Sequence, residues 1–336
     1  MKNTKIENIR VFAIFLVVLG HSIIMYTNWN VIETTQTIPY IKILKRFINV
    51  IEMPLFMSVS GYVFYYSKRK QFIPFVLNKG RRLLIPYICA GALWMAPLRM
   101  VMNIKNWNDG YFENVWKNLI CQKSVGHLWY LISLFLIFVI MYGIVRFRFR
   151  NKEAIIHDLV VLTTLLLISF TAKEGMFFQF GGTCVKRMFY YLFWFFLGYL
   201  LNKYSAKLQK VKEKSRIFNT ADSCVFVICF CLYNLYGGNI WYYLSAFCGV
   251  ILVYSMMPDK TNRTLEFIEK NSYGLYLFHS PMVYVTCSLF TEGNPYLVVA
   301  GNVVLLGLIS IGLTCFLRHT PLAFIIGEKY IKKVLN

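Results

Sequence analysis

Two ionisable side chains lie within the first apolar stretch, residues 9–26, which reads IRVFAIFLVVLGHSIIMY. Arg10 and His21 are eleven positions apart, which in an α-helix is a rise of roughly 16 Å and an angular offset of about 20°. A cation near a membrane surface and an imidazole near the bilayer centre therefore share one face. Ionisable groups inside membranes are costly and usually face a cavity or a bundle interior. An imidazole so placed can act as a general base or a nucleophile. The structural alternative carries equal weight: Arg10 snorkels to the headgroups and His21 bonds a neighbouring helix.

A second intramembrane histidine ends the stretch NSYGLYLFH, residues 271–279. Ser272 and His279 are seven residues apart and so lie on one helix face, with the histidine about 10 Å inside the bilayer. Tyr276 adds a hydroxyl to the same stretch. A second intramembrane histidine with a polar companion on its face favours a functional role for His279.

Other polar residues lie near the expected outer ends of apolar stretches. Glu52 begins EMPLFMSVSGY and can pair with a cation or bind a hydroxyl group, although an interfacial carboxylate in water fits equally well. Ser60 follows in the same stretch, where Gly61 also allows close helix packing. His127 and Trp129 lie in GHLWYL, where His127 is either a ligand or an interfacial polar group, and Trp129 is typical of the aromatic belt.

A basic group precedes the third apolar stretch in KGRRLLIPY, residues 79–87. Basic residues at a cytoplasmic helix start commonly serve only topology or lipid binding. The functional alternative is a phosphate site, because Lys79 and Arg82 are three residues apart and share a helical face. Arg81 is adjacent to both.

Composition restricts the class of protein. Of the 336 residues 57% are hydrophobic, 18% aromatic and only 15% charged, and the mean hydropathy is +0.52. These values indicate an integral membrane protein. The net charge of +21 lies mostly in short segments between apolar runs, which points to membrane orientation and away from nucleic acid. The nine cysteines show no CxxC spacing, so no metal site is expected.

The apolar runs predict an all-α bundle of about ten transmembrane helices. With the N-terminus inside, 26 of the 36 basic residues fall in cytoplasmic segments, which predicts that both termini are cytoplasmic. The loops are too short for a soluble domain, so residues 1–336 form one polytopic domain. The predicted spans are 9–26, 47–66, 82–103, 128–146, 156–173, 187–203, 221–237, 240–257, 272–291 and 296–317.

The motifs, taken in order, resemble the membrane-bound acyltransferase family 3, integral enzymes that O-acetylate surface polysaccharides, lipopolysaccharide, peptidoglycan and related glycans. The resemblance covers nearly the whole chain, from residue 6 to about 279. It matches the family's first-span arginine and histidine to Arg10 and His21, and its late tyrosine and histidine to Tyr276 and His279. The family's paired arginines fall on Lys79 and Arg82. Lysine at the first position lacks the bidentate fork of an arginine.

The resemblance implies an acyl-CoA donor, acetyl-CoA in particular, that enters from the cytoplasm with its phosphates on Arg10, Lys79, Arg81 and Arg82. Its thioester reaches towards His21. The acceptor is then a hydroxyl of an extracytoplasmic glycan or lipid-linked sugar, and His21 is either the general base or a transient acyl carrier. The enzyme would lie in the cytoplasmic (inner) membrane.

Two points stay open at this stage. The group that stabilises the oxyanion can be Tyr276, Ser60 or His279. The alternative function is a membrane transporter or a polysaccharide export or flippase component, in which mid-membrane polar residues bind cargo. A basic cytoplasmic cluster that converges with His21 favours the acyltransferase, since a transporter does not need one.

Overall fold

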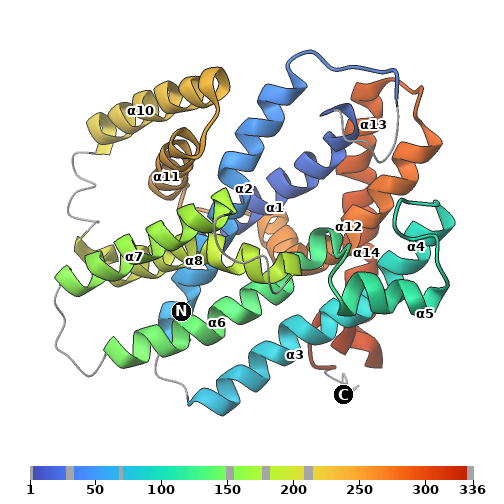
Figure 1. Ribbon diagram of the computed structural model, residues 1–336, viewed down its shortest axis with the longest axis horizontal. Helices are drawn as coiled ribbons and strands as arrows, with labels where there is room; N and C mark the ends of the chain where they lie inside the picture. The colour runs from blue at the N-terminus through green and yellow to red at the C-terminus, as the bar shows by residue number, and fades with distance from the viewer. Residues whose placement is uncertain are drawn as a thin grey trace. The chain divides into compact units, whose positions relative to one another are not determined.

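The structure is a computed structural model that describes residues 3–27, 34–67, 71–148, 155–175, 182–207 and 215–330 (Figure 1). Every regular element within these ranges is helical, and they contain no strand. The predicted all-α class is therefore confirmed.

Each of the ten predicted spans corresponds to one helix or to a run of consecutive helices. The runs arise where a π-helical turn interrupts an α-helix, as η3 and η7 do. The helices are α1 (Thr4–Ser22), α2 (Ile41–Phe64), α3 (Phe72–Ala90) with η3 (Gly91–Met95) and α4 (Ala96–Val101), α6 (Trp129–Arg148), α7 (Ile155–Glu174), α8 (Gly182–Lys203), α10 (Ser215–Tyr236), α11 (Asn239–Met256), α12 (Arg263–Leu289), and α13 (Pro295–Gly301) with η7 (Asn302–Leu306) and α14 (Gly307–Arg318).

Seven of these helices, within the described residues, are long and apolar enough to cross a membrane, which is typical of a multi-pass membrane protein. The other three are α1, α8 and α12. Helix α1 carries Lys5, Glu7 and Arg10, the first turns of α12 are charged, and α8 is rich in tyrosine and tryptophan. Most of α8 and the middle of α12 are buried among other helices. A helix surrounded by protein needs less apolar surface than one facing lipid, so hydropathy alone undervalues these three.

The chain folds as two compact units. The first comprises Met1–Ala13, Asn49–Leu77 and Ser133–Thr261, and the second comprises Ile14–Ile48, Asn78–Ile132 and Asn262–Asn336. The chain passes from one unit to the other within helices α1, α2, α3 and α6.

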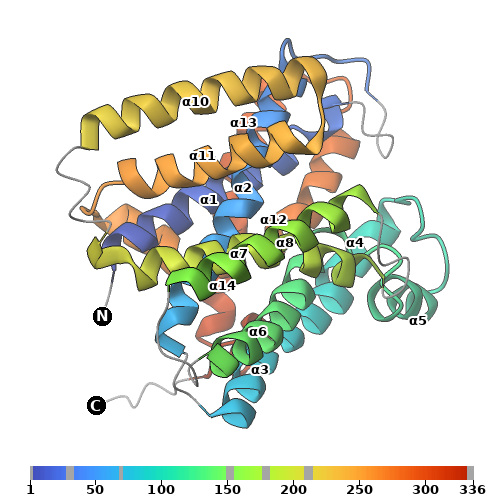
Figure 2. The same ribbon diagram turned by 60° about the vertical axis from the view of Figure 1, so that its left-hand side comes forward.

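The first unit is built on two antiparallel helix pairs, α7 with α8 and α10 with α11, which lie side by side (Figures 1 and 2). Helix α2 packs against α8 through reciprocal glycines. A Cβ on Gly61 would overlap the Phe195 carbonyl, and one on Gly198 would overlap the Ser58 carbonyl. The two backbones therefore approach as closely as glycine allows, which is the close packing expected of Gly61.

The second unit centres on α12, which packs on α14 (Figure 1). Asn262 caps α12, and its side chain accepts a hydrogen bond from the Leu265 N–H. Gly274 permits the contact with α14, because a Cβ there would overlap the Thr314 side chain. After α14 the helix η8 (Pro321–Ile326) turns back through Gly327, and Arg318 holds this turn through two hydrogen bonds to the Glu328 carboxylate.

Helices α3 and α12 each contain a proline beyond the first turn, and each of these prolines leaves a carbonyl without its helical donor. Pro86 in α3 frees the Arg82 carbonyl, and Pro281 in α12 frees the Leu277 carbonyl. A side chain from another element donates to each carbonyl. The Tyr273 hydroxyl bonds the Arg82 oxygen at 2.7 Å, and an imidazole, described next, bonds the Leu277 oxygen.

Candidate active site

Three histidines meet inside the second unit. His21 comes from the last turn of α1, His127 from the 3₁₀ turn η5 (Gly126–Leu128) and His279 from the middle of α12. Their ring centroids are 5.0 Å apart for His21 and His279, 5.6 Å for His127 and His279, and 6.4 Å for His21 and His127. His279 and His127 are buried, whereas His21 is half-buried. His21 is therefore the member that a substrate can reach.

The carbonyl partners of the histidines fix which ring nitrogens carry protons, because a carbonyl only accepts. The Nδ1–H of His279 donates to the carbonyls of Leu275 (2.8 Å) and Tyr276 (3.0 Å), so its Nε2 bears a lone pair. The Nδ1–H of His21 faces the Val17 carbonyl at 2.9 Å and the Nε2 of His279 at 3.3 Å. The Nε2 of His21 is consequently a basic lone pair.

His127 is held by α12 at two points. Its Nε2–H donates to the Leu277 carbonyl at 3.1 Å, which is the carbonyl that Pro281 leaves free. The Tyr276 hydroxyl donates to the main-chain carbonyl of His127 at 2.5 Å. The Nδ1 atom of His127 is buried and has no hydrogen-bond partner among the described residues. His127 is only 5% exposed, so it lies in the core of the second unit and is not the interfacial polar group that the sequence also allowed.

Tyr276 belongs to the same cluster, with its ring 5.5 Å from that of His127. Its hydroxyl is already committed to the His127 carbonyl. Trp94 lies in the π-helical turn η3 and donates its Nε1–H to the Phe278 carbonyl at 3.0 Å. Nothing in the sequence distinguishes Trp94 from the other tryptophans. A π-turn is not visible in the sequence, although such turns occur frequently at functional sites.

A buried arginine, also missed from the sequence, adjoins this cluster. Arg99 is 3% exposed and lies against Gly126, the residue before His127. Gly126 has φ +54°, and a Cβ there would overlap the guanidinium, so this position requires glycine for two reasons. The signal in the sequence was a lone arginine inside the predicted span 82–103, since intramembrane cations mark functional sites.

The basic group of α3 is separate from the histidines along the helix. Lys79 and Arg81 are half-buried and Arg82 is exposed. Arg82 lies 17 residues before Arg99 on the continuous α3–η3–α4 helix, a separation of roughly 25 Å at 1.5 Å per residue. The segment after α14 adjoins the Arg82 main chain, because a Cβ on Gly327 would contact it. Arg10 lies on α1 but belongs to the first unit, as do Glu52 and Ser60.

The remaining predicted site residues lie outside the histidine cluster or are engaged elsewhere. Glu52 is buried in α2, and the Ser60 hydroxyl donates to the Phe56 carbonyl of its own helix at 3.0 Å. Trp129 is the first residue of α6 and is 8% exposed, with its ring 6.1 Å from that of Tyr130.

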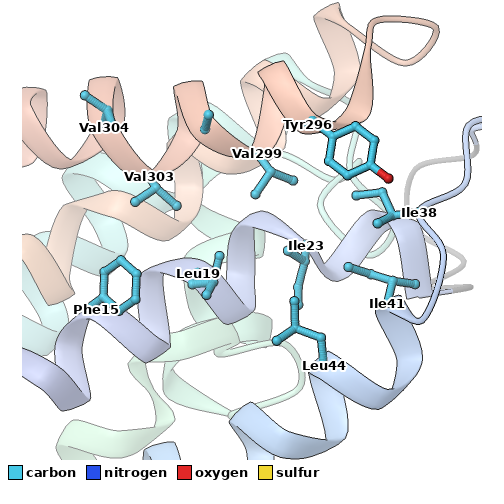
Figure 3. Close-up of a pocket in the computed structure, with 11 residues that line it drawn as sticks. Phe15, Leu19, Ile23, Ile38, Ile41, Leu44, Tyr296, Val299, Val303 and Val304 are labelled. Carbon is cyan, nitrogen blue, oxygen red and sulfur yellow. The ribbon is translucent and has the colours of Figure 1, made fainter.

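A pocket of about 400 Å³ opens in the second unit, and its walls are apolar (Figure 3). His21 does not point into it. Phe15 and Leu19 face the pocket from α1, and His21 is two residues beyond Leu19, about 200° round the helix. The pocket is therefore a separate apolar recess. It is lined by Phe15, Leu19, Ile23, Ile38, Ile41, Leu44, Tyr296, Val299, Ala300, Val303 and Val304.

The arrangement supports proton transfer or acyl transfer at the half-buried imidazole of His21. In the part of the chain that the structure describes, no group of three His, Cys, Asp or Glu side chains has the geometry of a metal site. No curated protein and no solved structure matches the chain. The family model of the acyltransferase domain matches residues 3–319. That match includes the three histidines, the buried arginine and the basic group of α3, and the chain therefore belongs to the acyltransferase 3 family.

Proposed function

We propose that this membrane acyltransferase moves an acetyl group from acetyl-CoA, bound at the cytoplasmic face, to a hydroxyl of an extracytoplasmic glycan or lipid-linked sugar. The observation that carries the proposal is the contact between His21 and His279. It leaves the Nε2 lone pair of a half-exposed imidazole as the accessible base in this cluster.

The base route accounts for every proton. The Nε2 of His21 takes the proton of the acceptor hydroxyl while the hydroxyl oxygen attacks the thioester carbonyl. When the tetrahedral intermediate collapses, the C–S bond breaks and the imidazolium returns the proton to the CoA thiolate. In the alternative route, Nε2 attacks the thioester first, the C–S bond breaks and CoA leaves as the thiolate. The acceptor hydroxyl then takes the acyl group as the C–Nε2 bond breaks, and its proton passes to the thiolate.

His279 supports either route as a positioning residue. Its Nδ1–H is fixed by two carbonyls of its own helix, so its Nε2 lone pair faces the Nδ1–H of His21. That hydrogen bond holds the ring of His21 in one tautomer and stabilises the imidazolium that forms when Nε2 takes a proton.

The basic group of α3 is the proposed donor site. Lys79, Arg81 and Arg82 supply a cationic surface for the phosphates of coenzyme A. The family resemblance assigns Arg10 of α1 to the donor as well, as a separate prediction. Both termini are proposed to be cytoplasmic, from the distribution of basic residues.

The test is transfer of labelled acetyl from acetyl-CoA by the purified protein in nanodiscs, together with mass spectrometry of surface glycans from cells with and without the gene. We expect purified protein to consume acetyl-CoA and the gene-less cells to lose the mass of one acetyl group from a glycan. Unchanged glycans together with no use of acetyl-CoA would overturn the proposal.

A further inference from the structure

Arg99 is a buried cation for which the described part of the chain supplies no acidic partner. Its side chain is 3% exposed. Among the residues that the structure describes, no carboxylate forms an ion pair or hydrogen bond with it. A buried charge is normally paired, because taking it out of water without a partner costs several kcal/mol. This exception therefore requires an explanation.

The hydrogen-bonding capacity of Arg99 is mostly unused. A guanidinium has five N–H donors. One Nη donates to the Ser124 carbonyl at 3.4 Å and the other to the Tyr284 hydroxyl at 3.3 Å, both long for a charged donor. The Nε–H is buried and has no hydrogen-bond partner among the described residues. The rings of Trp107 and Tyr284 lie 5.4 and 4.9 Å from the guanidinium carbon and partly stabilise the charge. The Nε–H, which together with an Nη–H binds oxyanions in a bidentate fashion, is thus the donor left unused among the described residues.

The location of Arg99 assigns it to the acceptor rather than to the donor. The donor phosphates are proposed to bind at the other end of the same helix, roughly 25 Å from Arg99. Arg99 contacts Gly126, the residue before His127, and Tyr284, which is five residues after His279 on α12. The charge of Arg99 interacts electrostatically with both His127 and His21.

We propose that Arg99 binds an acidic group, a carboxylate or a phosphate, on the acceptor, and that the enzyme therefore acylates acidic glycans. This inference rests on the proposed function, since it names the class of acceptor for the same site. The acidic group fills the Nε edge of Arg99 and fixes the position of the neighbouring hydroxyl beside the His21 ring. Arg99 in this role is a binding residue, whereas the proton is handled by His21.

The first test does not depend on acyl transfer. Thermal unfolding of the purified protein is measured with sodium glucuronate and with glycerol 1-phosphate, and with glucose and glycerol at the same ionic strength. A ligand that binds only the folded state raises the unfolding temperature. We expect the acids to stabilise the wild type and the neutral compounds to have no such effect. The stronger of the two acids identifies the group.

Variants assign the stabilisation to Arg99. Arg99→Gln should abolish the rise in unfolding temperature that the acids cause. Arg99→Lys keeps the charge and should show part of this rise, and it replaces the Gln variant if that variant does not purify. The matched control is Lys117→Gln, which removes a cation from η4 (Val115–Ile120), between α4 and α6. Lys117 is exposed and already paired with Glu113 and Asp109, which raise its pKa. No stabilisation of the wild type, or equal stabilisation of Arg99→Gln, overturns the proposal.

The second test is transfer kinetics with an oligosaccharide that contains uronic acid and with its carboxyl-reduced neutral form. Arg99→Gln should lower kcat/KM for the acidic acceptor by about 30-fold or more, carried by KM, because one partner of a buried charge pair is lost. Acetyl-CoA binding should not change, and kcat/KM for the neutral form should fall by much less than kcat/KM for the acidic acceptor. Equal loss with both acceptors would show that Arg99 acts as a structural strut. If the wild type transfers acetyl to neither oligosaccharide, the proposed function fails, and the unfolding test still decides whether Arg99 binds an acidic group.

Discussion

Tyr276→Phe distinguishes a catalytic hydroxyl from a positioning one. The variant removes the hydroxyl that donates to the His127 carbonyl at 2.5 Å. A buried hydrogen bond of this kind contributes about 0.5–1.5 kcal/mol, or about 1–3 kcal/mol where the carbonyl is left without a donor. If all of the larger loss appears in the transition state, kcat falls by about 5- to 150-fold. Donor KM should not change, because the basic group of α3 is untouched.

Tyr87→Phe is the matched control for this variant. The Tyr87 hydroxyl also donates to a buried carbonyl of the second unit, that of Leu119, at 2.7 Å. Both variants should lower the unfolding temperature by a similar amount, a few degrees. Only Tyr276→Phe should lower kcat.

Two outcomes would refute the reasoning. If Tyr276→Phe reduced kcat by more than about 10³-fold with unchanged stability, the hydroxyl would act on the reacting atoms, as an oxyanion donor does. If both variants reduced kcat equally, the effect of Tyr276 would reflect general stability and not the position of His127. Unfolding curves and transfer kinetics on the same preparations separate these cases.

Three further variants test the donor site and the packing of the second unit. Gly126→Ala should abolish transfer and destabilise the protein, because the φ of +54° and the adjacent Arg99 guanidinium both exclude a Cβ. Its control is Gly110→Ala, where the added Cβ meets open space, and this variant should leave transfer and stability nearly unchanged. Gly274→Ala should lower the unfolding temperature, because the added Cβ overlaps the Thr314 side chain of α14. Its control is Gly312→Ala, where the added Cβ meets open space. That variant should raise the unfolding temperature slightly, because alanine has the higher helix propensity and adds about 1 kcal/mol at most to the free energy of unfolding. Arg82→Ala should raise the KM for acetyl-CoA by more than the KM for the acceptor, and an unchanged dependence on donor would limit the basic group to a role in topology.

Apolar runs predicted where the helices lie and placed the starts of α6, α7, α11 and α13 within one residue, but they missed the polar first sections of other helices. Helix α12 starts at Arg263, nine residues before the predicted span, because Asn262 caps a polar first section that hydropathy does not detect. Helix α1 starts at Thr4 for the same reason and ends at Ser22, so His21 lies in its last turn. Polar and aromatic residues lower the mean hydropathy of α1, α8 and α12, as is expected of helices that pack against protein.

The site was predictable where depth and spacing carried the signal. Lone histidines deep in apolar runs indicated His21 and His279, and the structure brings both together. His127 was harder to place, because a 3₁₀ turn after a left-handed glycine folds it inward and leaves no periodic pattern. The sequence shows Pro281, and hence a free Leu277 carbonyl, but only the folded unit shows that His127 donates to it.

Arg99 marks the limit of the sequence reasoning. The sequence places Arg99 in the predicted span 82–103 but indicates no function for it. Its significance depends on the absence of an acidic partner among the described residues, which is a property of the packed structure. The relation between the donor cluster and Arg10, whose assignment was made from the family resemblance, stays a prediction.

His21→Gln tests the central claim most directly. The amide keeps a polar group in the half-buried position but cannot take up a proton or carry an acyl group, and general-base or nucleophilic roles contribute about 10²- to 10⁴-fold. The measurement is transfer of labelled acetyl by purified protein that elutes as a single species and binds acetyl-CoA as the wild type does. The matched control is His157→Ala, since His157 is an exposed histidine of α7. We predict loss of transfer by at least about 100-fold in His21→Gln and normal transfer in His157→Ala. Transfer by His21→Gln at a tenth of the wild-type rate or more would contradict the assignment of His21 as base or acyl carrier.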